Sequence, residues 1–196
     1  MDRLRCVLPE TRVRRAAAFL DRDGTICEEV GYLNHVSQMR IFPFAAEAIR
    51  VLNEAGLAVV VVTNQSGVAR KYFPESAVQE VHEVLLRELT AGGAKIDGIY
   101  YCPHAEADNC KCRKPKAGML TRAAEEHGLD LERSFVVGDR FGDVELGRAV
   151  GARSILVRTG YGEGELAWHA TSWPVQPDFV APTLTEAAAW IVERGR

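Results

Sequence analysis

A run of small apolar residues, Ala58 to Val62, constrains the fold of this chain most strongly. An apolar run without alternating polar residues is typical of a central strand in a parallel sheet, because helices cover both faces of such a strand. Other short β-rich runs follow the same rule along the chain, and longer segments with helical periodicity separate them. This alternation predicts an α/β fold, in which a mostly parallel sheet lies between two layers of helices.

The pattern predicts six strands and five helices. The strands are expected at residues 16–20, 57–62, 98–101, 134–137 and 154–157, with a short one near Phe179. The helices are expected at residues 44–55, 74–90, 117–127, 143–150 and 184–193. A length of 196 residues suits one domain, residues 1–196. Two long connections, 24–43 and 102–116, are expected to be functional, since long loops in compact domains usually are.

The composition argues against several classes of partner. A net charge of −3 gives no reason to expect nucleic acid, and no stretch approaches the roughly 20 apolar residues of a membrane span. The arginine-rich start lacks the continuous apolar region of a signal peptide. We therefore expect a cytoplasmic protein with reduced cysteines, unless a metal holds them. With no sizeable apolar surface stripe in the pattern, we expect a monomer.

Two carboxylates, Asp21 and Asp23, directly follow the first predicted strand, and Gly24 comes next. Ligands of open α/β sheets bind at the carboxyl ends of the strands, and residues two apart on an extended chain point to the same side. Two close carboxylates repel each other, which implies a metal ion or an unusual protonation state. Read alone, the pair suits a solvated turn equally well.

Three further segments at predicted strand ends suit a phosphorylated ligand. The first offers a hydroxyl and side-chain amides near a glycine, groups that cradle phosphate, at Thr63, Asn64, Gln65 and Ser66. The second offers cations for an anionic substrate, Arg113 and Lys114. The third offers oxygen ligands for Mg²⁺, Asp139 and Asp143, although Asp143 suits the N-cap of the next helix equally well.

The second long connection contains two tight pairs of metal ligands, Cys102 with His104 and Cys110 with Cys112. Three thiols and one imidazole form a closed tetrahedral set for a structural zinc ion, which leaves no position for a substrate. The alternative is a set of incidental free thiols, but free cysteines prefer buried apolar sites and these lie among charges. We therefore expect a zinc-stapled loop at residues 102–112.

Taken in order, these segments resemble the four motifs of the haloacid dehalogenase superfamily. Residues 21–25 match the first motif, Thr63 the second, Lys114 the third, and Asp139 with Asp143 the fourth. The phrases Phe-Leu-Asp-Arg-Asp-Gly-Thr-Ile, Val-Val-Thr-Asn-Gln-Ser-Gly-Val-Ala-Arg, Ile-Tyr-Tyr-Cys-Pro-His and Cys-Arg-Lys-Pro resemble one subfamily. That subfamily holds the D-glycero-D-manno-heptose 1,7-bisphosphate 7-phosphatases and the related histidinol-phosphate phosphatases. The resemblance implies a Rossmann-like core, and neither long connection is large enough for a full cap domain.

The resemblance implies a Mg²⁺-dependent phosphatase that removes the 7-phosphate of heptose bisphosphate during heptose precursor biosynthesis. Histidinol phosphate, or another small sugar phosphate, is the alternative substrate. Asp21 is the expected nucleophile, which forms an aspartyl-phosphate intermediate, and Asp23 the expected acid and base. Thr63 and Lys114 are expected to hold the transferred phosphoryl group. The expected Mg²⁺ ligands are the Asp21 carboxylate, the Asp23 main-chain carbonyl and the Asp139 carboxylate, with Asp143 as a further candidate.

The same resemblance assigns substrate contacts outside the motifs. Glu29, Val30, Gly31 and Tyr32 would contact the sugar, Arg113 the distal phosphate and Arg140 a further oxygen. For Glu29 and Tyr32, a solvated acid and a packed aromatic are equally good interpretations. Four histidines lack convergent partners in the sequence and are expected at surface or packing positions, namely His35, His82, His127 and His169. The glycine-rich segment 160–164 is expected to be a flexible connector.

Two other classes of function remain open. A phosphotransferase or mutase would share the motifs but would need a cap to bind an acceptor. A zinc-loop protein that binds partners or nucleic acid is disfavoured by the mild acidity and the full set of carboxylates.

Overall fold

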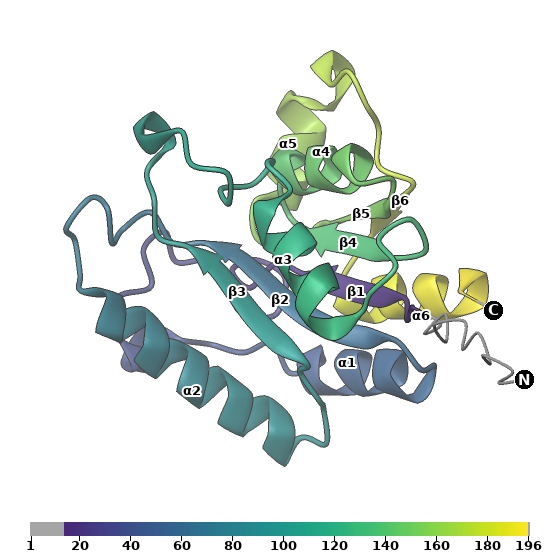
Figure 1. The fold of residues 1–196 in the computed structure, drawn as a ribbon, viewed down its shortest axis with the longest axis horizontal. Helices are drawn as coiled ribbons and strands as arrows, with labels where there is room; N and C mark the ends of the chain where they lie inside the picture. The colour runs from purple at the N-terminus through teal and green to yellow at the C-terminus, as the bar shows by residue number, and fades with distance from the viewer. Residues whose placement is uncertain (1–13, 196) are drawn as a thin grey trace, which may run out of the picture.

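The computed structural model describes residues 14–195, which form one six-stranded parallel sheet (Figure 1). The strands are β1 (Ala17–Leu20), β2 (Ala58–Asn64), β3 (Gly98–Cys102), β4 (Phe135–Gly138), β5 (Arg153–Val157) and β6 (Phe179–Ala181). Their order in the sheet is β3-β2-β1-β4-β5-β6, and every neighbouring pair is parallel. All six predicted strands are confirmed.

Six α-helices and three short 3₁₀ helices connect the described strands. The α-helices are α1 (Ala45–Glu54), α2 (Glu75–Ala91), α3 (Gly118–His127), α4 (Phe141–Ala149), α5 (Gly162–Trp168) and α6 (Leu184–Arg194). The 3₁₀ helices are η1 (Val36–Gln38), η2 (Glu106–Asp108) and η3 (Ala170–Ser172). Five helices match the prediction, but α5 was not predicted. None of the helices in residues 14–195 is both long and apolar enough to span a membrane.

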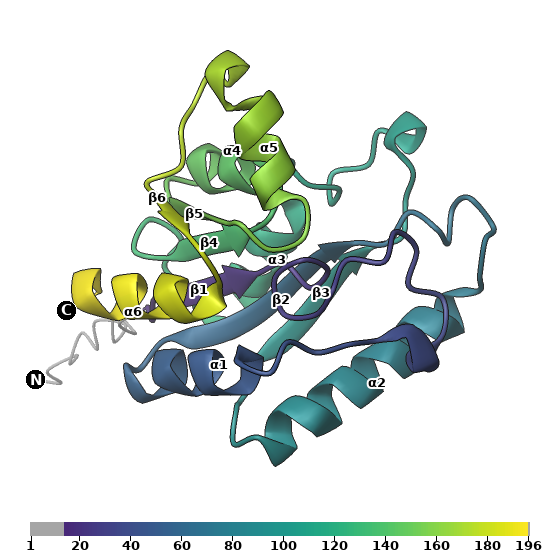
Figure 2. The same ribbon diagram turned by 180° about the vertical axis from the view of Figure 1, so that it is seen from behind.

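The apolar run in β2 is explained by cover on both faces of the sheet. Val59 and Val61 pack into the core on the side of α1, α2 and α6, whereas Val60 and Val62 pack on the side of α3 and α4 (Figures 1 and 2). All four are fully buried. At roughly 1.5–3 kcal/mol for each buried aliphatic side chain, this strand is strongly fixed in the middle layer.

The direction of the strand order changes at β1, which pairs with β2 on one side and β4 on the other. Chain segments that leave β1 and β4 therefore diverge to opposite sides, and a crevice opens at the carboxyl ends of these strands, where ligands bind in open α/β sheets. The β1–α1 connection of the described chain contains only η1, and the β3–α3 connection contains only η2. This agrees with the prediction of a fold without a full cap domain.

Candidate active site

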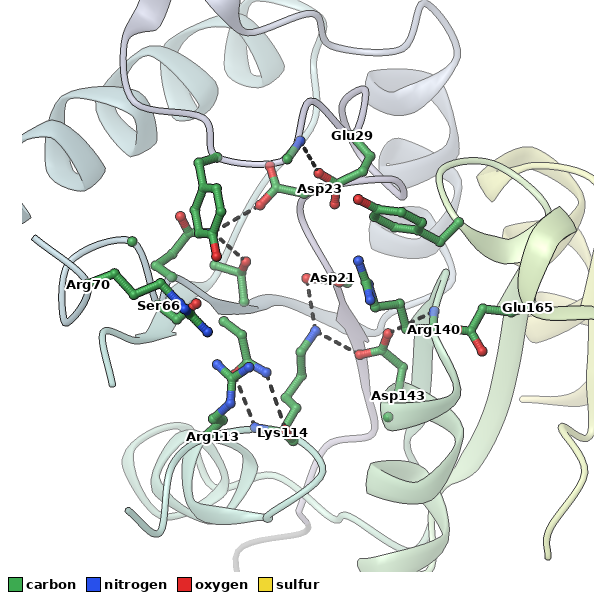
Figure 3. A pocket seen from close by; sticks show the side chains of 18 residues that line it. Asp21, Asp23, Glu29, Ser66, Arg70, Arg113, Lys114, Arg140, Asp143 and Glu165 are labelled. Atoms are coloured by element: carbon green, nitrogen blue, oxygen red, sulfur yellow. Dashed lines mark hydrogen bonds and ion pairs between the residues drawn. The ribbon is translucent and has the colours of Figure 1, made fainter. Parts of the chain in front are cut away.

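A buried lysine joins two carboxylates at the carboxyl ends of the central strands. Lys114, from the loop after β3, places its Nζ 2.9 Å from Asp21 Oδ1 and 2.7 Å from Asp143 Oδ1 (Figure 3). The Nζ also donates a hydrogen bond to the carbonyl of Val62, at 3.1 Å. Three residues from three segments of the chain, each predicted from a separate motif, thus share one site.

Asn64, predicted to contact substrate, also holds the backbone of Lys114. Its Nδ2 donates to the Lys114 carbonyl at 3.3 Å, and its Oδ1 accepts from the Lys114 N–H at 3.1 Å. This pair of bonds fixes the lysine loop against the end of β2. Asn64 also lines the pocket, so a substrate contact and a supporting contact are compatible.

Asp139 directly follows β4, and one of its oxygens lies within 4.8 Å of oxygens of Asp21 and Asp143. Its Oδ2 accepts a hydrogen bond from the backbone N–H of Tyr161 at 2.8 Å, and its buried Oδ1 has no hydrogen-bond partner within residues 14–195. A Cβ atom at either Gly24 or Gly160 would come within 2.1 Å of Asp139 Oδ2. Both positions therefore need glycine for the backbone to approach this carboxylate.

Asp143 was predicted either as a magnesium ligand or as the N-cap residue of the next helix, but the N-cap residue of α4 is Arg140. The helix begins at Phe141, so Asp143 lies in its first turn, where its Oδ2 accepts from the backbone N–H of Arg140 at 3.3 Å. Its other oxygen faces Lys114. A negative charge is favourable in the first turn of a helix, so this position suits the carboxylate that pairs with Lys114.

The carboxylates fit a divalent cation. One oxygen from each of Asp21, Asp139 and Asp143 lies within 4.8 Å of the others, and all three residues are buried. Burial raises the pKa of Asp21 to about 7, a rise that Lys114 opposes and that Asp143 adds to. Burial, followed by the charge of Asp21, raises the pKa of Asp139 to about 8. A hard cation would satisfy the unpaired oxygen of Asp139 and relieve this repulsion, and oxygen ligands are those that Mg²⁺ prefers.

Magnesium is expected to stabilise the protein more at pH 8 than at pH 6. The pKa values of Asp21 and Asp139 are higher in the folded than in the unfolded chain, where Asp titrates near 3.9. Between these values the folded state binds more protons, so the metal-free protein loses stability as the pH rises. At pH 6 the cation must displace those protons.

The measurement is the shift in melting temperature between magnesium-free and magnesium-saturated buffer of equal ionic strength. Asp139→Asn is the control variant and should remove most of the shift. Equal shifts at both pH values in the unchanged protein would contradict this account of the carboxylates.

The second predicted acid, Asp23, is held by neighbouring side chains. Arg22 donates to both of its oxygens, from Nη2 at 2.7 Å and from Nε at 3.0 Å. Gln65 Nε2 donates to Asp23 Oδ2 and to Thr63 Oγ1, both at 2.9 Å. Gln65 thereby links the first and second motifs, while the Asp23 carboxylate remains partly exposed in the pocket.

The prediction that His82 has no convergent partner was wrong. His82 lies on the buried face of α2, and its Nε2 is 3.2 Å from Nη1 of Arg22. Burial, followed by the charge of Arg22, lowers the pKa of His82 to about 3. A signal was present in the sequence, because His82 is four residues after Val78 and three before Leu85 on the apolar stripe of α2.

A cavity of about 460 Å³ contains nearly all the predicted substrate and catalytic residues. It is lined by Asp21, Asp23, Glu29, Gly31, Tyr32, Thr63, Asn64, Gln65, Ser66, Arg113, Lys114, Arg140 and Asp143, and also by residues that were not predicted, Gly67, Arg70, Gly142, Tyr161 and Glu165. Val30 is absent from this lining, and its side chain is 44% exposed. Figure 3 shows Arg70 and Arg113 toward one side of Lys114 and Arg140 with Glu165 toward the other.

The segment predicted as a flexible connector instead contributes to the pocket. Gly162–Trp168 forms α5, and the preceding Tyr161 lies under the guanidinium of Arg140, with 3.8 Å between its ring centroid and Arg140 Cζ. A Cβ at Gly162 would lie 1.8 Å from the carbonyl oxygen of Val157. The glycine therefore permits a helix to begin against the end of β5.

The predicted zinc ligands form a second cluster beside the pocket. Cys102 ends β3, and its Sγ is 3.2 Å from Cys112 Sγ and 3.5 Å from Cys110 Sγ. His104 Nδ1 is 3.3 Å from Cys112 Sγ. One ligand atom from each of the four residues lies within 4.8 Å of the others, and none of the three cysteines forms a disulfide. This closed set of three thiols and one imidazole fits a structural zinc ion.

Replacing one ligand of this cluster, as in Cys110→Ser, is expected to release the zinc and lower the melting temperature by several degrees. A structural zinc stabilises the folded chain directly. In a chain of this size, a loss of about 1 kcal/mol in the free energy of unfolding lowers the melting temperature by roughly 2–4 °C. Elemental analysis and thermal unfolding measure the two effects. Zinc-free protein with an unchanged melting temperature would show that the loop needs no metal.

Comparisons with known proteins place this geometry in a family. A family model described as HAD-hydrolase-like matches residues 111–187. A D-glycero-D-manno-heptose-1,7-bisphosphate 7-phosphatase of Thermosynechococcus vestitus is 40% identical over 191 residues, which cover 90% of this chain and 95% of the relative. The chain belongs to the haloacid dehalogenase-like hydrolases.

Other members of this hydrolase family agree with the assignment. A D-glycero-beta-D-manno-heptose-1,7-bisphosphate 7-phosphatase of Pseudomonas aeruginosa is 45% identical over 150 residues, covering 76% of this chain and 84% of the relative. A crystal structure of a D,D-heptose bisphosphate phosphatase from B. bronchiseptica, complexed with magnesium and phosphate, is 31% identical with a TM-score of 0.83. That alignment covers 91% of this chain and 98% of the other.

Proposed function

We propose that this hydrolase is a Mg²⁺-dependent phosphatase that removes the 7-phosphate of D-glycero-D-manno-heptose 1,7-bisphosphate. The observation that carries the proposal is the convergence of Asp21, Lys114 and Asp143 in one pocket. The relatives named above carry the same activity in their names at 40–45% identity. A monomeric state, a cytoplasmic location and a role in heptose precursor biosynthesis stay predictions.

In the proposed reaction, an Asp21 oxygen attacks phosphorus in line and forms a phosphoaspartate, while the bond to the sugar oxygen breaks. Asp23 gives a proton to the leaving sugar oxygen. It then takes a proton from the water that hydrolyses the phosphoaspartate and releases phosphate. Lys114 and Thr63 hold oxygens of the transferred group, where charge redistributes in the transition state.

The carboxylates of Asp21 and Asp139, with the main-chain carbonyl of Asp23, are proposed to hold Mg²⁺. When bound, the ion would offset the repulsion between an anionic nucleophile and an anionic phosphate. Asp143 pairs with Lys114 at 2.7 Å, and we assign it chiefly to that lysine. Zinc is proposed at Cys102, His104, Cys110 and Cys112.

The guanidinium groups at one side of the pocket suit the second phosphate of a bisphosphate. Arg113 and Arg70 both line the cavity near Ser66 (Figure 3). Arg113 Nη1 donates to the carbonyl of His104 at 3.3 Å, so the zinc loop helps to place it. Arginine binds phosphate oxygens through a planar fork of donors, which favours a substrate with two phosphates over a monophosphate such as histidinol phosphate.

The test is a comparison of kcat/KM with Mg²⁺ for heptose 1,7-bisphosphate, heptose 7-phosphate and histidinol phosphate. The bisphosphate should be the best substrate, and release of its 7-phosphate should leave the 1-phosphate on the sugar. Preference for histidinol phosphate, or removal of the 1-phosphate, would overturn the proposed substrate. Absence of phosphatase activity on all three would overturn the proposed reaction.

A further inference from the structure

A buried guanidinium lies directly beneath the proposed acid and base. The Arg22 side chain is only 1% exposed, although it lies between the aspartates of the first motif. A charge in such a position is costly unless it is paired and hydrogen-bonded. Arg22 meets this need with a two-pronged contact to Asp23, from Nε and Nη2, and a third contact from Nη1 to His82.

His82 accepts in this third contact. Because an arginine has donors only, the Nε2 of His82 must be the acceptor, and its Nδ1 carries the proton. The lowered pKa of His82 agrees with a neutral ring. Tyr101 packs edge-on against this ring with 5.5 Å between centroids, and its hydroxyl donates to Glu75 at 2.8 Å. The ring is therefore held from α2 and from β3.

We propose that His82 is a positioning residue that fixes the plane of the Arg22 guanidinium, and that Arg22 in turn aims the Asp23 carboxylate at the leaving oxygen. The inference rests on the proposed role of Asp23. The planar fork of Arg22 matches a carboxylate in one orientation. A guanidinium free to rotate would leave Asp23 held by Gln65 Nε2 at Oδ2 and, at Oδ1, by the weak thiol donor of Cys27 at 3.7 Å. A misoriented Asp23 carboxylate transfers protons poorly, whereas the groups that bind phosphate stay in place.

This role predicts a distinct kinetic pattern. The sugar oxygen is a poor leaving group unless it receives a proton. A misoriented Asp23 carboxyl therefore slows formation of the phosphoaspartate. p-Nitrophenolate leaves without a proton, so attack by Asp21 on p-nitrophenyl phosphate still breaks the bond to the phenol oxygen at normal speed. The following hydrolysis needs Asp23 to take a proton from water with either substrate.

The experiment compares His82→Phe and His82→Gln with the unchanged protein. His82→Phe keeps the ring volume but removes the acceptor, and about a 10- to 100-fold lower kcat on the sugar phosphate is expected, with KM within about twofold. With p-nitrophenyl phosphate, His82→Phe should release a burst of nitrophenolate equal to the enzyme concentration before slow turnover. His82→Gln restores an acceptor and should recover much of the lost kcat.

His127→Phe is the matched control, since His127 is paired with Tyr100 at 3.0 Å and is not part of the pocket lining. It should leave kcat unchanged and produce no new burst. An unchanged kcat in His82→Phe, or an equal fall in kcat without a burst for both His82 variants, would overturn the positioning role. If His82→Phe does not fold, His82→Leu removes the same acceptor and takes its place in both measurements, with the same expected loss of kcat and the same expected burst.

This experiment separates the inference from the proposed substrate. Failure of the unchanged protein to hydrolyse heptose bisphosphate would overturn the substrate, whereas the burst with p-nitrophenyl phosphate tests His82 whatever the natural substrate is.

Discussion

Replacing the nucleophile, as in Asp21→Asn, is expected to lower kcat by about 10⁴- to 10⁶-fold, because an amide cannot form the phosphoaspartate. Asparagine has nearly the same shape, and its oxygen can still accept from Lys114, which lies 2.9 Å from Asp21 Oδ1. The substitution also removes one of three buried, mutually repelling carboxylates. The melting temperature of the magnesium-free protein should therefore not fall.

Steady-state hydrolysis of heptose bisphosphate and thermal unfolding test this expectation together. Asp130→Asn is the matched control, since the Asp130 side chain accepts a local hydrogen bond from the backbone N–H of Arg133 and should keep full activity when replaced. A variant at Asp21 that retains more than about 1% of the kcat would exclude Asp21 as the nucleophile.

Removing the buried cation, as in Lys114→Met, is expected to damage activity and stability at once. Loss of one preorganised donor to the transferred phosphoryl group should cost about 10²- to 10³-fold in kcat. Methionine would also leave Asp21 and Asp143 buried without their shared partner, and breaking such a pair costs about 3–5 kcal/mol. The corresponding fall in melting temperature is roughly 6–20 °C for a chain of this size.

The pH dependence of this loss follows from the same charges. Lys114 remains protonated throughout the neutral range, because the two carboxylates raise its pKa despite burial. Lys114 lowers the pKa of Asp21, so without the lysine Asp21 should hold its proton to higher pH, and the stability deficit should be larger at pH 8 than at pH 5.5. Lys95→Met provides the comparison, since the Lys95 side chain is 68% exposed where it pairs with Asp97, and this pair should be worth no more than about 1 kcal/mol. Equal melting temperatures for both lysine variants would contradict the account of the buried pair.

The sequence was sufficient for most of the fold because its signals are local and repeated. The uninterrupted apolar run of β2 indicated a strand that is covered on both faces. The apolar stripe of α2 indicated a helix with one buried face. The cluster of three cysteines and one histidine was also predictable, since close spacing of Cys102 with His104, and of Cys110 with Cys112, brings each pair together in any compact loop. The motifs after β1, β2 and β4 converge because the strands are parallel.

Other features depend on contacts that no local pattern encodes. No local pattern around Arg22 indicates burial, yet the fold buries it against His82, which lies 60 residues away in α2. The helix α5 escaped prediction because Gly162 and Gly164 weaken its local propensity, whereas the close approach to β5 requires the first of these glycines. Val30 was grouped with its neighbours as a sugar contact, but it is 44% exposed and does not line the pocket.

The claim on which the mechanism depends is that Asp21 accepts the phosphoryl group, and chemical trapping tests it most directly. Protein quenched during turnover is reduced with borohydride, which converts a phosphoaspartate into homoserine, and is then digested with trypsin. Cleavage after Arg15 and Arg22 gives the peptide 16–22, in which Asp21 is the only acidic side chain. We predict homoserine in this peptide when substrate is present and none when it is withheld. Homoserine at Asp23 instead, with residues 16–22 unmodified during turnover, would contradict the account.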